Sequence, residues 1–129
     1  MPHRPHDPPD VAAPSGGYSH GLAVDPGARY LFISGQIPTR PDGSVPDTFA
    51  EQCDAAWGNV VAVLRAAGMT VADLVKVTTY LTDRDQVAEN RAVRQRHLGA
   101  ARPALTVVIA QTLDPAWLLE IEAIAATTA

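Results

Sequence analysis

Hydrophobic and polar residues alternate one by one in residues 118–125, near the end of the chain. This period of two is typical of a β-strand. One face of the predicted strand is wholly apolar, with Leu119, Ile121, Ala123 and Ala125. The other face carries two carboxylates, Glu120 and Glu122. A carboxylate in a central strand costs free energy unless it has a partner or a function, so Glu120 is a candidate functional group, whereas solvation explains Glu122 equally well.

Four further segments have the composition of strands. Residues 19–24 and 30–34 are separated by Asp25-Pro26-Gly27, a sequence typical of a tight turn, so we expect them to form a hairpin. Residues 74–81 and 104–110 are rich in β-branched side chains and are also predicted to be strands. The stretch 38–46 contains Asp42-Gly43 and three prolines, which indicates a surface loop.

Two helices are predicted between these strands. Thr48 and Glu51 have the spacing of a capping box, and apolar residues then recur at three- and four-residue intervals up to Gly68. A second helix is expected to begin at Asp83 or Asp85 and to run to about Leu98. Its apolar stripe, which consists of Val87, Val93 and Leu98, is thin, so we expect a half-exposed helix.

The order β-β-α-β-α-β-β predicts an α/β (α+β) domain with one mixed sheet and two helices on one face. A strand–helix–strand crossover is normally right-handed, and this places both helices on the same side. The opposite sheet face still carries Val and Ile, so we expect obligate self-association through it. The domain spans 17–129, and the Pro-rich stretch 1–16 is expected to be a flexible arm.

Composition limits the possible functions. The net charge of −4 and the pI of about 5.4 disfavour a nucleic-acid partner. The chain has no apolar run of about 18 residues and no recognisable signal segment, so we expect no membrane association. Cys53, the single cysteine, lies on the apolar stripe of the first helix, which indicates core packing and a reducing cytoplasm. His3 and His6 are followed by no further ligand pattern, so no metal is expected.

Several motifs together resemble one known family over roughly residues 17–126. They are Ser34-Gly35-Gln36-Ile37-Pro38, Glu51-Gln52, Ala66-Ala67-Gly68, the strand 73–81, Arg102-Pro103-Ala104 and the strand 119–125. Each motif alone is weak, but their order and spacing resemble those of the reactive intermediate deaminase (RidA/YjgF) family. The resemblance implies a chorismate-mutase-like fold and a homotrimer with small-molecule sites in clefts between subunits. It also implies hydrolysis of imines and enamines without a metal or an organic cofactor.

The resemblance assigns roles to individual residues. Glu120 matches the carboxylate that orients the attacking water. Tyr18, Ser34 and Asn90 match residues that line the cleft, and the segment Leu105, Thr106 and Val107 matches the one that contacts the substrate. These roles suit the chemistry, because an imine carbon needs a water held by an acceptor and a leaving amine needs a proton donor.

Leu105 is the main departure from the family pattern. Active deaminases have an arginine at this position that holds the substrate carboxylate, and losing such a contact removes about 1.5–3 kcal/mol of anchoring. Arg102 is displaced by three residues along a strand, so its side chain points to the opposite face. Three hypotheses follow. The first is an enzyme whose substrate lacks the carboxylate, with Glu120 still activating water in a biosynthetic step. The second is a 2-imino-acid deaminase that holds the anion by another group, and the third is a non-catalytic trimer that binds a ligand or a partner protein.

Overall fold

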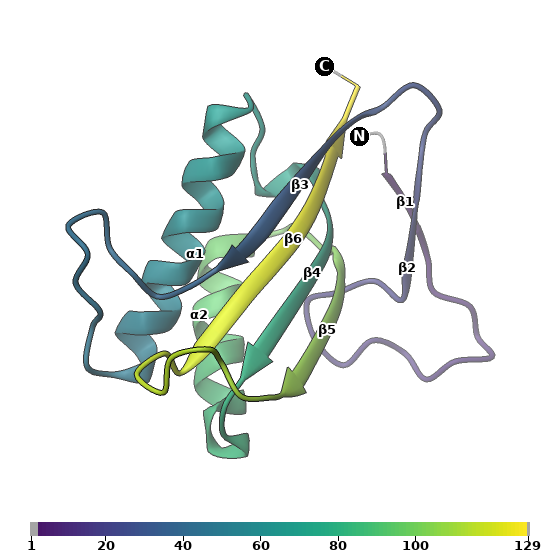
Figure 1. The fold of residues 1–129 in the computed structure, drawn as a ribbon. Coiled ribbons are helices and arrows are strands. Elements are labelled where there is room, and N and C mark those ends of the chain that lie inside the picture. The colour runs from purple at the N-terminus through teal and green to yellow at the C-terminus, as the bar shows by residue number, and fades with distance from the viewer. Residues whose placement is uncertain (1–2, 129) are drawn as a thin grey trace.

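The computed structural model describes residues 3–128 (Figure 1). The six strands are β1 (His3–His6), β2 (Gly21–Val24), β3 (Arg29–Gln36), β4 (Leu74–Leu81), β5 (Ala104–Ile109) and β6 (Leu119–Thr127). The two α-helices are α1 (Phe49–Ala66) and α2 (Val87–Leu98). Short 3₁₀ turns at Val71–Asp73 and Arg84–Gln86 precede β4 and α2.

Four strands form one mixed sheet in the order β3-β6-β4-β5. β6 is antiparallel to both neighbours, whereas β4 and β5 are parallel and are joined through α2. Both helices lie on the same side of this sheet (Figure 1). The predicted α+β class, the mixed sheet and the placement of the helices are therefore confirmed.

The core fills the space between the helices and the sheet. Every apolar side chain predicted for the inner face of β6 is buried, and so is the central part of the α1 stripe, including Cys53 and Trp57. From β4, Val77 and Leu81 complete this layer. The two carboxylates of β6 consequently lie on the face of the sheet that the helices leave uncovered.

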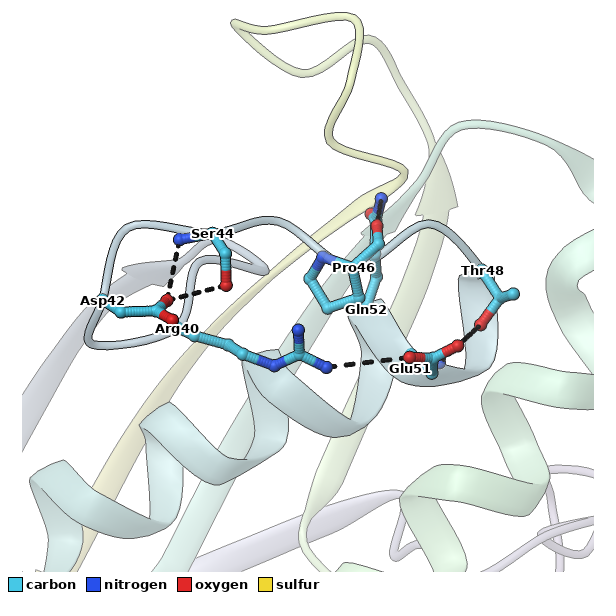
Figure 2. A network of polar contacts seen from close by, with 7 residues as sticks. All are labelled: Arg40, Asp42, Ser44, Pro46, Thr48, Glu51 and Gln52. Carbon is cyan, nitrogen blue, oxygen red and sulfur yellow. Dashed lines mark hydrogen bonds and ion pairs between the residues drawn. The ribbon is translucent and has the colours of Figure 1, made fainter.

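The loop between β3 and α1 is held by a chain of polar contacts (Figure 2). Half of the predicted capping box is present: Thr48 Oγ1 accepts a hydrogen bond from Glu51 N at 3.2 Å, but the Glu51 carboxylate accepts from the Thr48 hydroxyl, at 3.0 Å, rather than from the Thr48 backbone N–H. Gln52, which is buried, donates to the carbonyls of Pro46 at 2.9 Å and Ala116 at 3.0 Å. Its Oε1 also accepts from Leu118 N at 2.8 Å. Gln52 thus ties the β3–α1 loop to the start of β6.

One prediction for the N-terminal part is wrong. Residues 19–24 and 30–34 do not form a hairpin, since β2 pairs with β1 and β3 pairs with β6. Pairing with β6 places Ile33 in the core. The predicted flexible arm contains β1 in its described part, residues 3–16, because a two-stranded sheet consists of edges and so tolerates Pro5.

The second helix also differs in detail from the prediction. Asp83 caps the 3₁₀ turn rather than α2, and its side chain accepts from Asp85 N at 2.8 Å. Val87, which the apolar pattern places in the buried stripe, is exposed. Asn90 and Arg94 are buried instead, so the inner face of α2 is more polar than its sequence pattern predicts.

The uncovered sheet face carries large apolar side chains. Phe32 is 72% exposed, and its ring stacks on Tyr30 at a centroid distance of 6.2 Å. Beside them is a shallow hollow of about 290 Å³ lined by residues of β3, β4 and β6, including Ser34, Lys76 and Glu122. No helix in residues 3–128 has the length and apolar character needed to cross a bilayer.

Candidate functional site

Glu120 lies on β6 at a position opposite Tyr80 of β4. Two residues further along the same face, Glu122 Oε1 accepts a hydrogen bond from the Tyr80 hydroxyl at 2.6 Å. This hydrogen bond is the main cause of a raised pKa of Tyr80, with desolvation and the nearby charges of Glu122 and Glu120 adding to it. Within residues 3–128, no side chain donates a hydrogen bond to Glu120 and no cation pairs with it. The Glu120 carboxylate therefore has no side-chain partner in the described chain, whereas Glu122 is engaged with Tyr80.

A β-bulge brings β3 close to the Glu120 carboxylate. Ile33 pairs with Ala123 and Gln36 with Ile121, so β3 carries one residue more than β6 across this interval. Gly35 lies inside the bulge. A Cβ atom on Gly35 would fall 2.8 Å from Glu120 Cδ and closer still to Glu120 Oε2. Because glycine has no Cβ, the backbone can pass directly against the carboxylate in its present position, and any larger residue would displace the carboxylate.

The residues that the family resemblance assigned to the site fall into two groups on the single chain. The sheet-face group lies on the uncovered side and consists of Ser34, Thr106 and Glu120. Thr106 belongs to it because its Oγ1 accepts from Lys76 Nζ, a side chain that lines the hollow on that face. The helix-side group lies on the side of α2 and consists of Tyr18, Asn90, Leu105 and Val107.

The helix-side group is assembled at the edge formed by β5. Ser19 N donates to Pro103 O at 3.1 Å and Ser19 Oγ donates to Arg102 O at 2.7 Å, which fixes the segment carrying Tyr18 beside the start of β5. Leu105 pairs with Val77 in the β4–β5 register and packs against the core. Arg102 itself is exposed and donates to the carbonyls of Gly99 and Ala101, which is a structural role.

Asn90 contributes a buried amide to the helix-side group. It is 2% exposed, and Cys53 Sγ donates to its Oδ1 at 3.7 Å. Burial raises the pKa of Cys53 to about 12, and the charge of Asp54 adds to the effect. The predicted packing role of Cys53 agrees with this environment, because a thiol with so high a pKa stays protonated and unreactive.

One buried charged residue near this group was missed. Arg94 lies on the same face of α2 as Asn90, one turn later, and is 5% exposed. Its neighbours Val93 and Leu98 are apolar, so periodicity alone gave no reason to place an arginine inside. The spacing of four residues between Asn90 and Arg94 is the only signal in the sequence that links the two.

No metal site is evident in the part of the chain that the structure describes. Between residues 3 and 128, no three His, Cys, Asp or Glu side chains gather in the way that a metal ion requires. The polar groups of the candidate site include the carboxylate of Glu120, the buried amide of Asn90, the buried guanidinium of Arg94 and the hydroxyl groups of Tyr18, Ser34 and Thr106. Such a set can orient water and bind a polar small molecule.

Comparisons with known proteins identify the family of the chain. The family model described as Endoribonuclease L-PSP matches residues 9–127. A RutC family protein from Pyrococcus horikoshii is 36% identical over 114 residues, covering 87% of this chain and 88% of that protein. TdcF of Escherichia coli K12, which carries the name "Putative reactive intermediate deaminase", is 36% identical over 110 residues, covering 82% and 84%.

Solved structures show the same relationship. A conserved Rid family protein of unknown function, YyfB from Yersinia pestis, superimposes with a TM-score of 0.87 at 30% identity and covers 98% of this chain and 100% of its own. The crystal structure of E. coli TdcF with bound serine gives a TM-score of 0.72 at 36% identity, covering 87% and 89%. The chain therefore belongs to the reactive intermediate deaminase (RidA/YjgF) family.

Proposed function

We propose that this protein is an enzyme that adds water to an imine or enamine and releases the carbonyl compound and ammonia. The observation that carries the proposal is the Glu120 carboxylate, which lies on an open sheet face without a partner among the described residues and is held against Gly35. The relationship to TdcF, whose name refers to reactive intermediate deamination, supports the reaction type. No cofactor takes part in the proposed chemistry.

The proposed reaction needs one water and one base. Glu120 accepts a proton from the water as its oxygen attacks the imine carbon, which forms a C–O bond and converts the C=N bond to a single bond. Glu120 passes this proton to the nitrogen, the C–N bond breaks, and the remaining proton of the hydroxyl group goes to the departing nitrogen. The products are the carbonyl compound and ammonia, and the Glu120 carboxylate is regenerated. A positioned base of this kind contributes about 10²- to 10⁴-fold in rate.

A complete site requires two subunits under this proposal. The sheet-face group and the helix-side group lie on opposite sides of one chain, so a substrate cannot contact both within a monomer. A homotrimer in which the sheet face of one subunit meets the β5 edge of the next would join them, as the family resemblance implies. The exposed Phe32 and Tyr30 support self-association through that face.

Leu105 defines how the substrate is held. Its side chain packs against the core and offers an apolar surface where the family pattern has an arginine. We infer that the substrate has no anionic group bound at position 105. A biosynthetic imine, enamine or carbonyl compound would meet this condition, and so would an imino acid whose carboxylate is bound elsewhere.

The test is hydrolysis of two short-lived imines generated in the assay. An amino-acid oxidase acting on alanine supplies 2-iminopropanoate, and an amine oxidase acting on benzylamine supplies an uncharged imine. Semicarbazide traps the surviving imine, so faster hydrolysis appears as less trapped product. We expect the wild-type protein to accelerate the loss of at least one of them.

Two matched variants locate the base. Glu120→Gln should lower the acceleration by at least about 10²-fold. Glu122→Gln alters the neighbouring carboxylate on the same strand and should retain most of the activity. Equal activity in Glu120→Gln and wild type would remove Glu120 from the mechanism. No acceleration of either imine by an intact oligomer would reject the enzyme and favour a non-catalytic ligand-binding trimer.

A further inference from the structure

Arg94 is a buried arginine without an ionic partner. Its side chain is 5% exposed, and no carboxylate in residues 3–128 forms an ion pair with it. Arg94 Nε has no hydrogen-bond partner among the described residues. A buried charge normally has a partner, because an unpaired one carries a large desolvation penalty. Arg94 therefore needs an explanation that the folded chain does not supply.

The surroundings of Arg94 are those of the helix-side group. A Cβ atom on Gly16 would lie 3.8 Å from Arg94 Nη2 and 3.8 Å from Tyr18 Cδ1, so the guanidinium and the tyrosine ring border the same small space. Asn90 lies one turn earlier on the same face of α2. The Arg94 guanidinium thus lies close to the ring of Tyr18, a residue that the family resemblance assigns to the substrate site.

A second unsatisfied group lies beside the first. Gln95 Oε1 is also buried without a hydrogen-bond partner in the described chain, and it lies directly beneath Gly17. Burial lowers the pKa of Arg94, and the charge of Arg91 adds to this effect. Because an arginine stays protonated in proteins, the lowered pKa describes a cation held in an unfavourable environment.

We propose that Arg94 binds the anionic group of the substrate, a carboxylate, in the space beside Gly16 that its guanidinium shares with the Tyr18 ring. The planar guanidinium fork suits a carboxylate, which it can hold through two parallel hydrogen bonds. The proposal rests on the proposed function of this protein and specifies how its substrate is bound. It changes the expectation of an uncharged substrate, because that expectation considered only position 105 on β5. The anion is bound from α2 instead.

Binding of pyruvate tests this assignment without requiring turnover. Pyruvate carries a carboxylate next to a carbonyl, as the product of a 2-imino acid would. Titration of the full-length protein, followed by calorimetry, should show saturable binding. Arg94→Met removes the charge while keeping an unbranched side chain, and it should weaken binding about 10- to 100-fold. Arg94→Lys should retain part of the affinity.

Arg91→Met is the matched control, because Arg91 is an exposed arginine on the same helix. It lowers the net charge by the same amount and should leave pyruvate binding unchanged. Thermal unfolding adds a second measurement. Removing an unpaired buried charge should leave the melting temperature of Arg94→Met equal to or above that of wild type.

Each outcome decides the question. Wild-type protein that fails to bind pyruvate, or Arg94→Met that binds it as well as wild type, would overturn the proposal. A lower melting temperature together with dissociation of the oligomer would show that Arg94 pairs with a neighbouring subunit, which also overturns it. If pyruvate binds through Arg94 but no imine is hydrolysed, only the proposed function fails. If the uncharged imine is hydrolysed by a protein that does not bind pyruvate, only the Arg94 assignment fails.

Discussion

Replacing Gly35 by alanine tests whether the position of Glu120 matters for activity. The new Cβ would lie 2.8 Å from Glu120 Cδ and 3.1 Å from Cγ. Carbon atoms pack at about 3.5–4.0 Å, so the carboxylate must move by about 1 Å. The end of a glutamate side chain is flexible, and the backbone therefore need not move. A misplacement of about 1 Å can lower the rate about 10²-fold, equivalent to about 2.7 kcal/mol in the activation barrier.

The same substitution should have little effect on stability. Alanine restricts the unfolded chain more than glycine does, which favours the folded state by about 0.4–1 kcal/mol and offsets the cost of moving Glu120. Gly35 does not have a positive φ angle, so alanine causes no backbone strain. Gly35→Ala should thus separate activity from stability, with kcat reduced about 10²-fold and the melting temperature nearly unchanged.

Semicarbazide trapping of 2-iminopropanoate and of the uncharged imine gives the rates, and thermal unfolding gives the stability. Gly58→Ala in α1 is the matched control, because a Cβ on Gly58 meets no atom within 4 Å. The control should keep full activity and gain about 0.5–1 kcal/mol of stability. Gly35→Ala introduced into Glu120→Gln should add no further loss, since both act through one group. Full activity in Gly35→Ala would refute the role given to Glu120.

Three further predictions concern stability and assembly. Gln52→Met leaves the carbonyls of Pro46 and Ala116 unpaired. It should lower the free energy of unfolding, measured by urea denaturation, by about 2–4 kcal/mol. A loss below about 0.5 kcal/mol would show that water replaces the amide. The pKa of Cys53 rises from 9.0 to about 12 on folding, because the folded protein favours the protonated thiol. This contribution to the free energy of unfolding is complete below pH 9 and is lost between pH 9 and 12. Wild type should lose stability over that range relative to Cys53→Val, and Ellman's reagent should not react with the native protein at about pH 8. Phe32→Glu should reduce the oligomer to monomers in sedimentation velocity, whereas an intact trimer would show that this face is not the interface.

The elements with strong periodicity were predictable from the sequence. The N-cap at Thr48 and the apolar stripe of α1 are local signals, and the alternation in β6 by itself places Glu120 on the face opposite the core. These signals depend only on neighbouring residues. The order of elements then determines the class of the fold and the side on which the helices lie.

The errors arise where long-range contacts decide the structure. β1 contains Pro5 and has no alternation, and only its pairing with β2 makes it a strand. The polar inner face of α2 likewise has no local signature, because Arg94 is covered by the distant segment around Gly16. The division of the site residues between two sides of the sheet depends on strand register, which sequence spacing alone does not give.

The separation of Glu120 and Arg94 on opposite sides of the sheet has a genetic consequence. Two inactive variants, one altered at each position, would carry complementary defects rather than the same one. If the protein forms the proposed trimer, random reassembly of mixed and dissociated subunits would give about a quarter of the clefts between subunits an intact half from each parent. Co-expression of the two inactive genes should therefore rescue activity that neither gene provides alone.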